Sequence, residues 1–493
     1  MLLFVAAFLS FAQPSPALIP DSSVIIRQVT LTGNYRTRDR IILREMALHP
    51  GDIVRVADLP GKLDWDRNKI SNTNLFITVA VQRVNVAGFV ETQTGENDSI
   101  PRSVSPQTGE TAVVDDSLPG YVDIEVTMKE RWYVIVYPVF ELADRNFNEW
   151  WYQRGRDLRR TVYGARLSYK NVTGNNDKLG LIAELGFLSR FSANYQIPYI
   201  DRAQRFGLKV ETSYQTNNEI AYRSQFDKLV FIRNSDQQLR EQFIGNLALT
   251  RRDGFYRFHE FGLKYVATNV ADTVARLNPD YLLNGQTRQR YAQLSYGFRY
   301  DRRDNVAYPL RGTLGGVQIN WFGILPGDNV RQVETVGTYG RFWPLGGRWF
   351  ASAGVRGQVI FPQRQPYTLL RGLGYNQEVV RGYELYSVEG QHFALSKNTL
   401  RFRLFDTMKQ LRWLKIRQFN TVPVSAYLTA FADAGYVWNS YKLPYESRLA
   451  NQLLTGTGVS LDVVTFYNLV ARFSLSVNGR GERGFFFNLS QEL

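Results

Sequence analysis

Residues 291–300 read YAQLSYGFRY, and the rhythm of this stretch decides the fold. Its apolar residues alternate with small or polar ones, with Ala292, Leu294, Tyr296, Phe298 and Tyr300 on one side and Gln293, Ser295, Gly297 and Arg299 on the other. Successive side chains of a β-strand point to opposite faces, so the stretch predicts a strand with one apolar face. The other face carries Arg299, a charge that a packed core could not hold but a hydrated interior can.

The same alternation continues from Trp132 to the end of the chain and predicts sixteen strands. These strands are 133–142, 162–170, 178–187, 191–199, 206–217, 242–252, 256–268, 290–300, 312–323, 332–343, 348–360, 392–405, 424–437, 454–464, 469–477 and 484–492. Strands of about 9–13 residues are long enough to cross a bilayer when tilted. A soluble sandwich would also alternate, but its core could not hold so many inward charges. The predicted fold class is therefore mainly β, with a sixteen-stranded antiparallel transmembrane β-barrel over residues 132–493.

An even number of strands places both ends of the barrel on the same side of the membrane. The connections then alternate between short turns at 171–177, 252–255, 302–311 and 344–347 and long loops at 143–161, 218–241, 269–289 and 361–391. Short periplasmic turns and long external loops are typical of an outer-membrane barrel. Residues 221–232 also alternate, and we assign them to an extended external loop.

The residues before the barrel predict a small α+β domain over 24–130 with the order β-α-α-β-β. The predicted strands are 24–32, 75–86 and 121–129, and the predicted helices are 37–48 and 57–72. Thr37 is expected to cap the first helix, because a threonine hydroxyl accepts a hydrogen bond from a free backbone N–H there. Residues 89–120 are rich in small, acidic and proline residues and are predicted to be a flexible insertion.

Residues 1–12, MLLFVAAFLSFA, form an apolar run with a small-x-small ending that resembles the core of a signal peptide. The basic residues that usually precede such a core are missing, so we interpret the segment as a truncated signal peptide. Past it, no run of about eighteen apolar residues occurs, which argues against a helical membrane protein. The formal charge of +14 fits a polar lumen or contact with lipid phosphates, and no basic block favours nucleic acid.

The side-chain chemistry predicts no catalytic centre, no metal site and no cofactor. The absence of cysteine removes disulfides, thiolate metal sites and cysteine nucleophiles. The three histidines, His49, His259 and His392, have no metal-ligand spacing to a partner. A hydrolase built on His259 is the alternative, but no G-x-S-x-G elbow and no local serine accompany it.

Three motifs carry a resemblance to a known family. They are Val380-Arg381-Gly382-Tyr383, Phe431-Ala432-Asp433-Ala434-Gly435, and Tyr300-Asp301-Arg302-Arg303-Asp304-Asn305 followed by Pro309-Leu310-Arg311-Gly312. Their order and spacing from the end of the chain resemble the BamA-like superfamily of outer-membrane assembly and translocation proteins. That resemblance implies a barrel of the bacterial surface antigen type preceded by a POTRA domain. Residues 24–130 resemble a POTRA domain in their element order and at Gly33-Asn34, Gly51-Asp52 and Asn74-Leu75-Phe76.

The resemblance also implies that the loop 361–391 folds back into the lumen, where Arg381, Gly382 and Tyr383 form a lock. Its arginine is expected to pair with Asp433. The alternation agrees, because Ala430, Ala432 and Ala434 make a small apolar outward face and leave Asp433 inward. A guanidinium and a carboxylate in a partly dry lumen make a geometrically specific pair.

The second predicted site is a lateral seam between the first and last strands, at Pro138, Gly484, Phe487 and Leu489. Proline cannot donate to a ladder and belongs at a sheet edge, so the seam is expected to be under-bonded. The last strand resembles the signal that directs such barrels to assembly, although the chain ends in Leu493 rather than an aromatic.

The predicted function is an outer-membrane insertase or translocase, with the POTRA domain in the periplasm. Its expected partners are unfolded outer-membrane or secreted client proteins, outer-membrane lipids, and accessory lipoproteins or periplasmic proteins. The alternatives are a passive outer-membrane channel and an exporter of the two-partner-secretion type.

Overall fold

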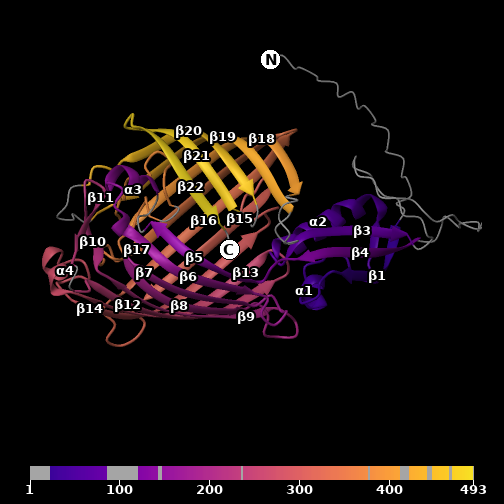
Figure 1. Ribbon diagram of the computed structural model, residues 1–493, viewed down its shortest axis with the longest axis horizontal. Helices are drawn as coiled ribbons and strands as arrows, with labels where there is room; N and C mark the ends of the chain where they lie inside the picture. Colours follow the sequence, from indigo (N-terminus) through magenta and orange to yellow (C-terminus); the bar gives the residue numbers. More distant parts are fainter. Residues whose placement is uncertain are drawn as a thin grey trace, which may run out of the picture.

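The computed structural model describes residues 23–85, 120–142, 147–234, 237–375, 378–410, 421–440, 447–465 and 469–491. The predicted signal peptide lies outside these residues, as does the predicted insertion up to residue 119. Figure 1 shows a large rolled sheet with a smaller α+β region against one of its ends. None of the helices among the described residues is both long and apolar enough to cross a membrane.

The large sheet contains sixteen antiparallel strands, and all sixteen predicted strands are confirmed within a few residues at their ends. They are β5 (Val134–Leu142), β6 (Thr161–Lys170), β7 (Lys178–Gly186), β8 (Leu188–Ile197), β9 (Phe206–Asn217), β12 (Arg240–Asp253), β13 (Arg257–Val270), β14 (Arg288–Asp301), β15 (Gly312–Phe322), β16 (Gln332–Gly346), β17 (Trp349–Phe361), β18 (His392–Gln410), β19 (Thr421–Trp438), β20 (Leu453–Thr465), β21 (Leu469–Asn478) and β22 (Arg483–Gln491). Each strand pairs with its neighbours in sequence, except that β9 pairs with β12. The intervening β10 (Glu219–Gln225) and β11 (Lys228–Arg233) form a separate hairpin within the predicted external loop.

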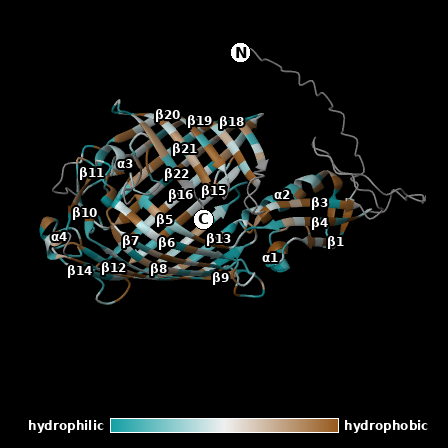
Figure 2. Ribbon diagram, viewed as in Figure 1, coloured by the Kyte–Doolittle hydropathy of each residue, from teal (hydrophilic) through white to brown (hydrophobic). Residues whose placement is uncertain are grey.

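The two faces of this sheet differ as the alternation predicts. Large apolar side chains such as Tyr163, Leu294 and Leu475 are exposed on the outer face. Polar and charged side chains such as Glu184 and Asp462 are buried on the inner face. Figure 2 shows the resulting change between hydrophobic and hydrophilic residues along each strand. The outside of the barrel is therefore apolar, and its lumen is polar.

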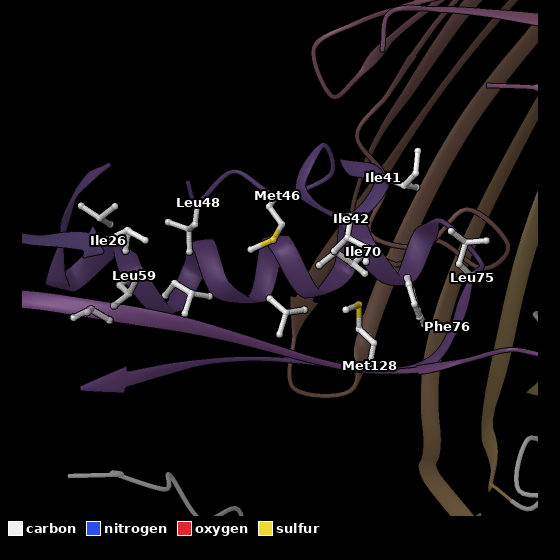
Figure 3. Close-up of a cluster of buried hydrophobic side chains, with 14 of the residues drawn as sticks. Ile26, Ile41, Ile42, Met46, Leu48, Leu59, Ile70, Leu75, Phe76 and Met128 are labelled. Atoms are coloured by element: carbon white, nitrogen blue, oxygen red, sulfur yellow. The ribbon is translucent and has the colours of Figure 1, made fainter. Parts of the chain in front are cut away.

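The N-terminal α+β region has a four-stranded sheet in the order β2-β1-β4-β3. Its elements are β1 (Ser23–Thr32), α1 (Asp39–Leu43), β2 (Ile53–Arg55), η1 (Val56–Asp58), α2 (Leu59–Asn72), β3 (Phe76–Asn85) and β4 (Gly120–Glu130). The predicted order β-α-α-β-β omitted the short strand β2 and the 3₁₀ turn η1. Figure 3 shows the core of this region, where Met46, Ile70 and Met128 lie among buried aliphatic side chains around α2.

The prediction of a helix over 37–48 with Thr37 as its cap was wrong. The helix α1 is only five residues long, and no side chain caps its start. After Arg44 the backbone tightens to i→i−3 bonds, from Glu45 to Ile42 and from Met46 to Leu43. The carboxylate of Asp66 then accepts the next two backbone N–H groups, those of Ala47, at 2.6 Å, and Leu48, at 3.3 Å. Those N–H groups consequently do not continue the helical ladder.

Thr37 instead lies at the junction between the N-terminal region and the barrel. Its hydroxyl donates to Glu130 at 2.7 Å and accepts from the side-chain amide of Asn171, in the turn after β6, at 2.9 Å. Two further contacts fix the same junction. Trp65 of α2 donates to the hydroxyl of Tyr256 at 2.8 Å, and Arg252 of β12 forms an ion pair with the buried Glu45. The N-terminal region is thus bound to the short turns of the barrel.

Candidate functional site

The connection from β17 to β18 folds into the barrel, and we call residues 362–391 the lumen loop. Its tip, Val380, Arg381, Gly382 and Tyr383, lies inside the sheet rather than in solvent. Val380 is 1% exposed and Tyr383 is 4% exposed, and both pack in a cluster that includes Val437 and Leu454 of the wall. Loops normally run over the surface, so the burial of this tip requires specific partners for its polar groups.

Arg381 and Asp433 are brought together by this fold. The guanidinium donates from Nε to Oδ2 of Asp433 at 2.7 Å and from Nη2 to Oδ1 at 2.5 Å. The backbone N–H of Arg381 also donates to Oδ2, at 3.2 Å. The guanidinium carbon Cζ lies 3.9 Å from the ring centroid of Phe431, which faces inward beside Asp433. The bidentate ion pair with Asp433 and the cation–π contact with Phe431 fix both the position and the orientation of the arginine.

Glycines in the barrel wall make room for the loop tip. A Cβ at Gly456 would overlap the carbonyl oxygen of Arg381, and one at Gly435 would meet Val380. A Cβ at Gly458 would crowd the ring of Phe431. We call these three glycines, with Phe431 and Asp433, the seat. The sequence analysis did not identify Gly456 and Gly458, although glycines two residues apart lie on one face of a strand.

Gly382 connects the loop tip to the turn before the last strand. Its φ of +101° lies in the region that favours glycine. Its N–H donates to Glu384 at 2.7 Å, and its carbonyl accepts from the side-chain amide of Asn478 at 3.1 Å. The same amide of Asn478 donates to Glu482 at 2.7 Å. The tip is therefore held by β21 and the β21–β22 turn as well as by the seat.

A second group of buried charges lies on the inner wall of β20 and β21. The carboxylate of Asp462 accepts from Arg472 Nε at 2.9 Å and from the hydroxyl of Tyr308 at 2.8 Å. Tyr308 belongs to the turn 302–311, which the sequence analysis singled out as a motif without foreseeing that its tyrosine enters the lumen. Asn72 of α2 donates to the carbonyl of Asp304 in this turn at 3.1 Å. The turn thus touches both the N-terminal region and the lumen wall.

The predicted seam residues lie on the two edges of the sheet. β5 and β22 end the strand order, and no ladder joins them among the described residues. Pro138 is on the outer face of β5, and Leu489 is exposed on β22. Phe487 pairs with the outward Phe473 and shares that face. Gly484 points inward instead, where the ring of Phe486 covers it.

The histidines have ordinary structural contacts. His259 lies beside Tyr296, with 3.0 Å between Nδ1 and the hydroxyl oxygen. His392 accepts the backbone N–H of Ile360 at 3.2 Å. In the part of the chain that the structure describes, no group of three or more acidic or histidine residues could hold a metal ion.

Comparison with known proteins assigns this architecture to a family. The Omp85 superfamily domain matches residues 171–493, which is more than half of the chain. The chain belongs to the Omp85 superfamily. No protein with a curated description matches it. Membership identifies it as an outer-membrane protein of polypeptide insertion or secretion.

Solved structures of this superfamily resemble the chain in fold at low sequence identity. BamA from Haemophilus ducreyi lacking POTRA domains 1–3 aligns with a TM-score of 0.50 and 15% identity, covering 95% of this chain and 84% of that one. CdiB from Acinetobacter baumannii has a TM-score of 0.46 and 11% identity, with coverage of 95% and 73%. CdiB from Escherichia coli has a TM-score of 0.47 and 12% identity, with coverage of 98% and 92%.

Proposed function

We propose that this Omp85 protein inserts client polypeptides into the outer membrane through the seam between β5 and β22. The observation that carries the proposal is that the described residues of these two strands form no ladder with each other, whereas every other neighbouring pair of the sixteen is hydrogen-bonded. A free strand edge presents a row of N–H and C=O groups that can pair with an incoming strand. A client strand added at this edge would already lie beside the lipid.

The lumen loop supports insertion through the side rather than passage through the bore. Its tip occupies the lumen and is bound to the seat by the buried Arg381–Asp433 pair. Its position also holds β18 to β21 together on the inner side. We propose that Arg381, Gly382 and Tyr383 act as a lock that keeps this wall rigid while the seam opens. A passive channel would need an unobstructed bore.

The N-terminal region, residues 24–130, is proposed to act as a POTRA domain that receives the client in the periplasm. Its strand β3 is at one edge of the four-stranded sheet and pairs only with β4 among the described residues. An extended client segment could therefore add to β3 by backbone hydrogen bonds. The contacts of Thr37, Trp65 and Glu45 would hold that segment next to the mouth of the barrel.

The absence of cysteine allows a direct test by cross-linking. The double variant Pro138→Cys/Phe487→Cys places two thiols on the outer faces of the two edge strands. The protein is reconstituted in vesicles of phosphatidylethanolamine and phosphatidylglycerol, and a urea-unfolded small outer-membrane barrel polypeptide is added. Bridging the two thiols with a short bis-maleimide is expected to abolish insertion of that polypeptide.

The control variant is Leu475→Cys/Phe485→Cys, because these outward residues are already register partners in β21 and β22. Bridging them should leave insertion unchanged. Insertion that persists with the seam bridged would overturn the proposal. Passage of the polypeptide into the vesicle interior with the seam bridged would favour an exporter instead.

A further inference from the structure

The loop that follows β5 crosses the seam on the external side. The helix α3 (Phe147–Gln153) belongs to this loop, yet its Cα atoms lie within 8 Å of those of β22, the opposite edge of the sheet. Figure 1 shows α3 near the external end of the last strands. The chain then returns through η2 (Leu158–Arg160) to β6. We infer that residues 147–160 form an external clasp that holds the seam shut at its outer end.

Polar contacts fasten the clasp to the lumen loop and to the external hairpin. The side-chain amide of Gln153 donates to the carbonyl of Leu385 in the lumen loop at 3.4 Å. Arg154 donates to the carbonyl of Leu229, in the external hairpin, at 3.3 Å and to the buried Glu149 at 2.5 Å. The guanidinium of Arg154 also lies 4.4 Å from the ring centroid of Phe231. Glu149 belongs to the clasp itself and positions Arg154, whereas Leu385, Leu229 and Phe231 lie far from β5 in sequence. The contacts with these three residues tie separate parts of the barrel together.

The lumen loop completes the connection to β22. The hydroxyl of Tyr386, the residue after Leu385, donates to the carboxylate of Glu482 at 2.8 Å. Glu482 directly precedes β22. A set of contacts therefore runs from Gln153 of α3 through Leu385 and Tyr386 to Glu482 at the start of β22. The described ladders join no residue of β5 to β22, and this external route couples the two edges through side chains.

The outer surface of the clasp suits the membrane interface. Phe147, Trp151 and Tyr152 are 42%, 39% and 58% exposed. The guanidinium of Arg156 lies 3.9 Å from the ring centroid of Trp151. Aromatic residues with a neighbouring cation are favoured at the headgroup level. A released clasp would consequently remain in the interface and could close again.

This inference rests on the proposed insertion through the seam, because it assigns the control of opening to the external loop. The bond from Gln153 to Leu385 is long, at 3.4 Å, and joins two neutral groups, so the clasp is the weaker of the two restraints on the lumen loop. The other restraint, the Arg381–Asp433 ion pair, is buried and bidentate. Opening is therefore expected to begin at the external end of the seam.

The first experiment measures the seam directly, without a client. Spin labels are attached at Phe140→Cys and Phe485→Cys, which are outward residues near the external ends of β5 and β22. Pulsed electron paramagnetic resonance on the full chain in vesicles then gives the distribution of their separation. The variant Gln153→Ala is expected to shift this distribution to longer distances. Arg159→Ala is the matched control, because Arg159 pairs with Asp157 within the same segment.

The second experiment fixes the clasp with Gln153→Cys/Leu385→Cys. Oxidation of this pair is expected to narrow the distribution of Phe140–Phe485 separations, measured in this case with fluorescent unnatural amino acids in place of spin labels. Oxidation should also abolish insertion of the small barrel polypeptide, and reduction should restore it. Insertion unaffected by the disulfide, or a separation unaffected by both Gln153→Ala and the disulfide, would overturn the clasp. A changed separation in a protein that inserts nothing even when reduced would support the clasp and contradict the proposed function.

Discussion

Two regions of the same sheet are held in opposite ways. One is the wall of β18 to β21, which contains the seat, and the other is the seam between β5 and β22. In the wall, β18 and β19 are 19 and 18 residues long and pair along their whole length, and the lumen loop is bound to the inner side. At the seam, β5 and β22 are each 9 residues long, and in the described part of the chain no ladder joins them. The comparison teaches that one sheet combines a wall held by long ladders and a buried loop tip with two edges that have neither. The edges rely on short strands and external contacts.

The inner face of the seam side contains a ladder of charges that stops at the edge. Arg166 of β6 donates to Glu141 of β5 at 2.7 Å and to the buried Glu184 of β7 at 2.6 Å. Arg190 of β8 also donates to Glu184, at 2.9 Å. The ladder stabilises β5 to β8 as one unit up to the seam. An opening motion would then move this unit against the wall of β18 to β22.

The largest expected effect is on the seat. Arg381→Ala leaves the carboxylate of Asp433 buried without its guanidinium, which should cost about 3–5 kcal/mol of unfolding free energy. Urea unfolding in phospholipid vesicles measures this loss. Arg159→Ala, which removes an exposed pair, should cost no more than about 1 kcal/mol. Equal losses in the two variants would contradict the contrast between buried and exposed pairs.

Asp66 provides a contrast to Asp433, because its carboxylate is buried and accepts hydrogen bonds from backbone N–H groups. Burial raises the pKa of Asp66 in the N-terminal region to about 6, against its two backbone hydrogen bonds. The pKa of Asp66 is higher in the folded than in the unfolded state. Its protonation therefore contributes to the unfolding free energy below about pH 4, and this contribution is lost as the pH rises through about 6. The loss should reach up to about 3 kcal/mol. Hydrogen exchange of β4, corrected for intrinsic rates, measures the stability of this region. Its stability should fall with rising pH in the wild type and should fall less in Asp66→Asn.

The glycines of the seat offer a steric test. Gly456→Ala places a Cβ against the carbonyl of Arg381, so we expect a loss of about 1–3 kcal/mol and displacement of the loop tip. Gly337→Ala in β16 is the control, because its Cβ would meet no atom within 4 Å. Limited proteolysis within the lumen loop should accelerate only in the first variant. Unchanged cleavage would show that the seat tolerates a shifted tip.

A smaller effect is expected at the turn 302–311. Tyr308→Phe removes the hydrogen bond to Asp462 but retains Arg472 as a partner and the packing of the ring against Tyr427. The cost should be about 1 kcal/mol in urea unfolding, the usual range for one such bond. A loss as large as that of Arg381→Ala would assign the turn to the rigid wall.

The smallest effect is expected at the seam. Pro138→Ala restores a backbone N–H on an edge that has no ladder to β22, so the unfolding free energy should change by no more than about 0.5 kcal/mol. The rate of client insertion is the informative measurement. Slower insertion at unchanged stability would support a role for the proline in keeping the edge open. A large gain in stability would indicate that the new N–H closes the seam.

The sequence by itself determined the barrel, because a period of two residues is a local property of each strand. The number of strands, the apolar outer face and the inward position of Asp433 all follow from that rhythm. Only the tertiary structure decided features that depend on which distant segments meet. Asp66 binds the backbone of residues 18 and 19 positions earlier, just after the first helix. Gly435 and Gly456 make room for a loop tip from another part of the chain, and α3 lies close to β22. No local pattern encodes such contacts, since their partners are fixed only when the sheet has rolled up.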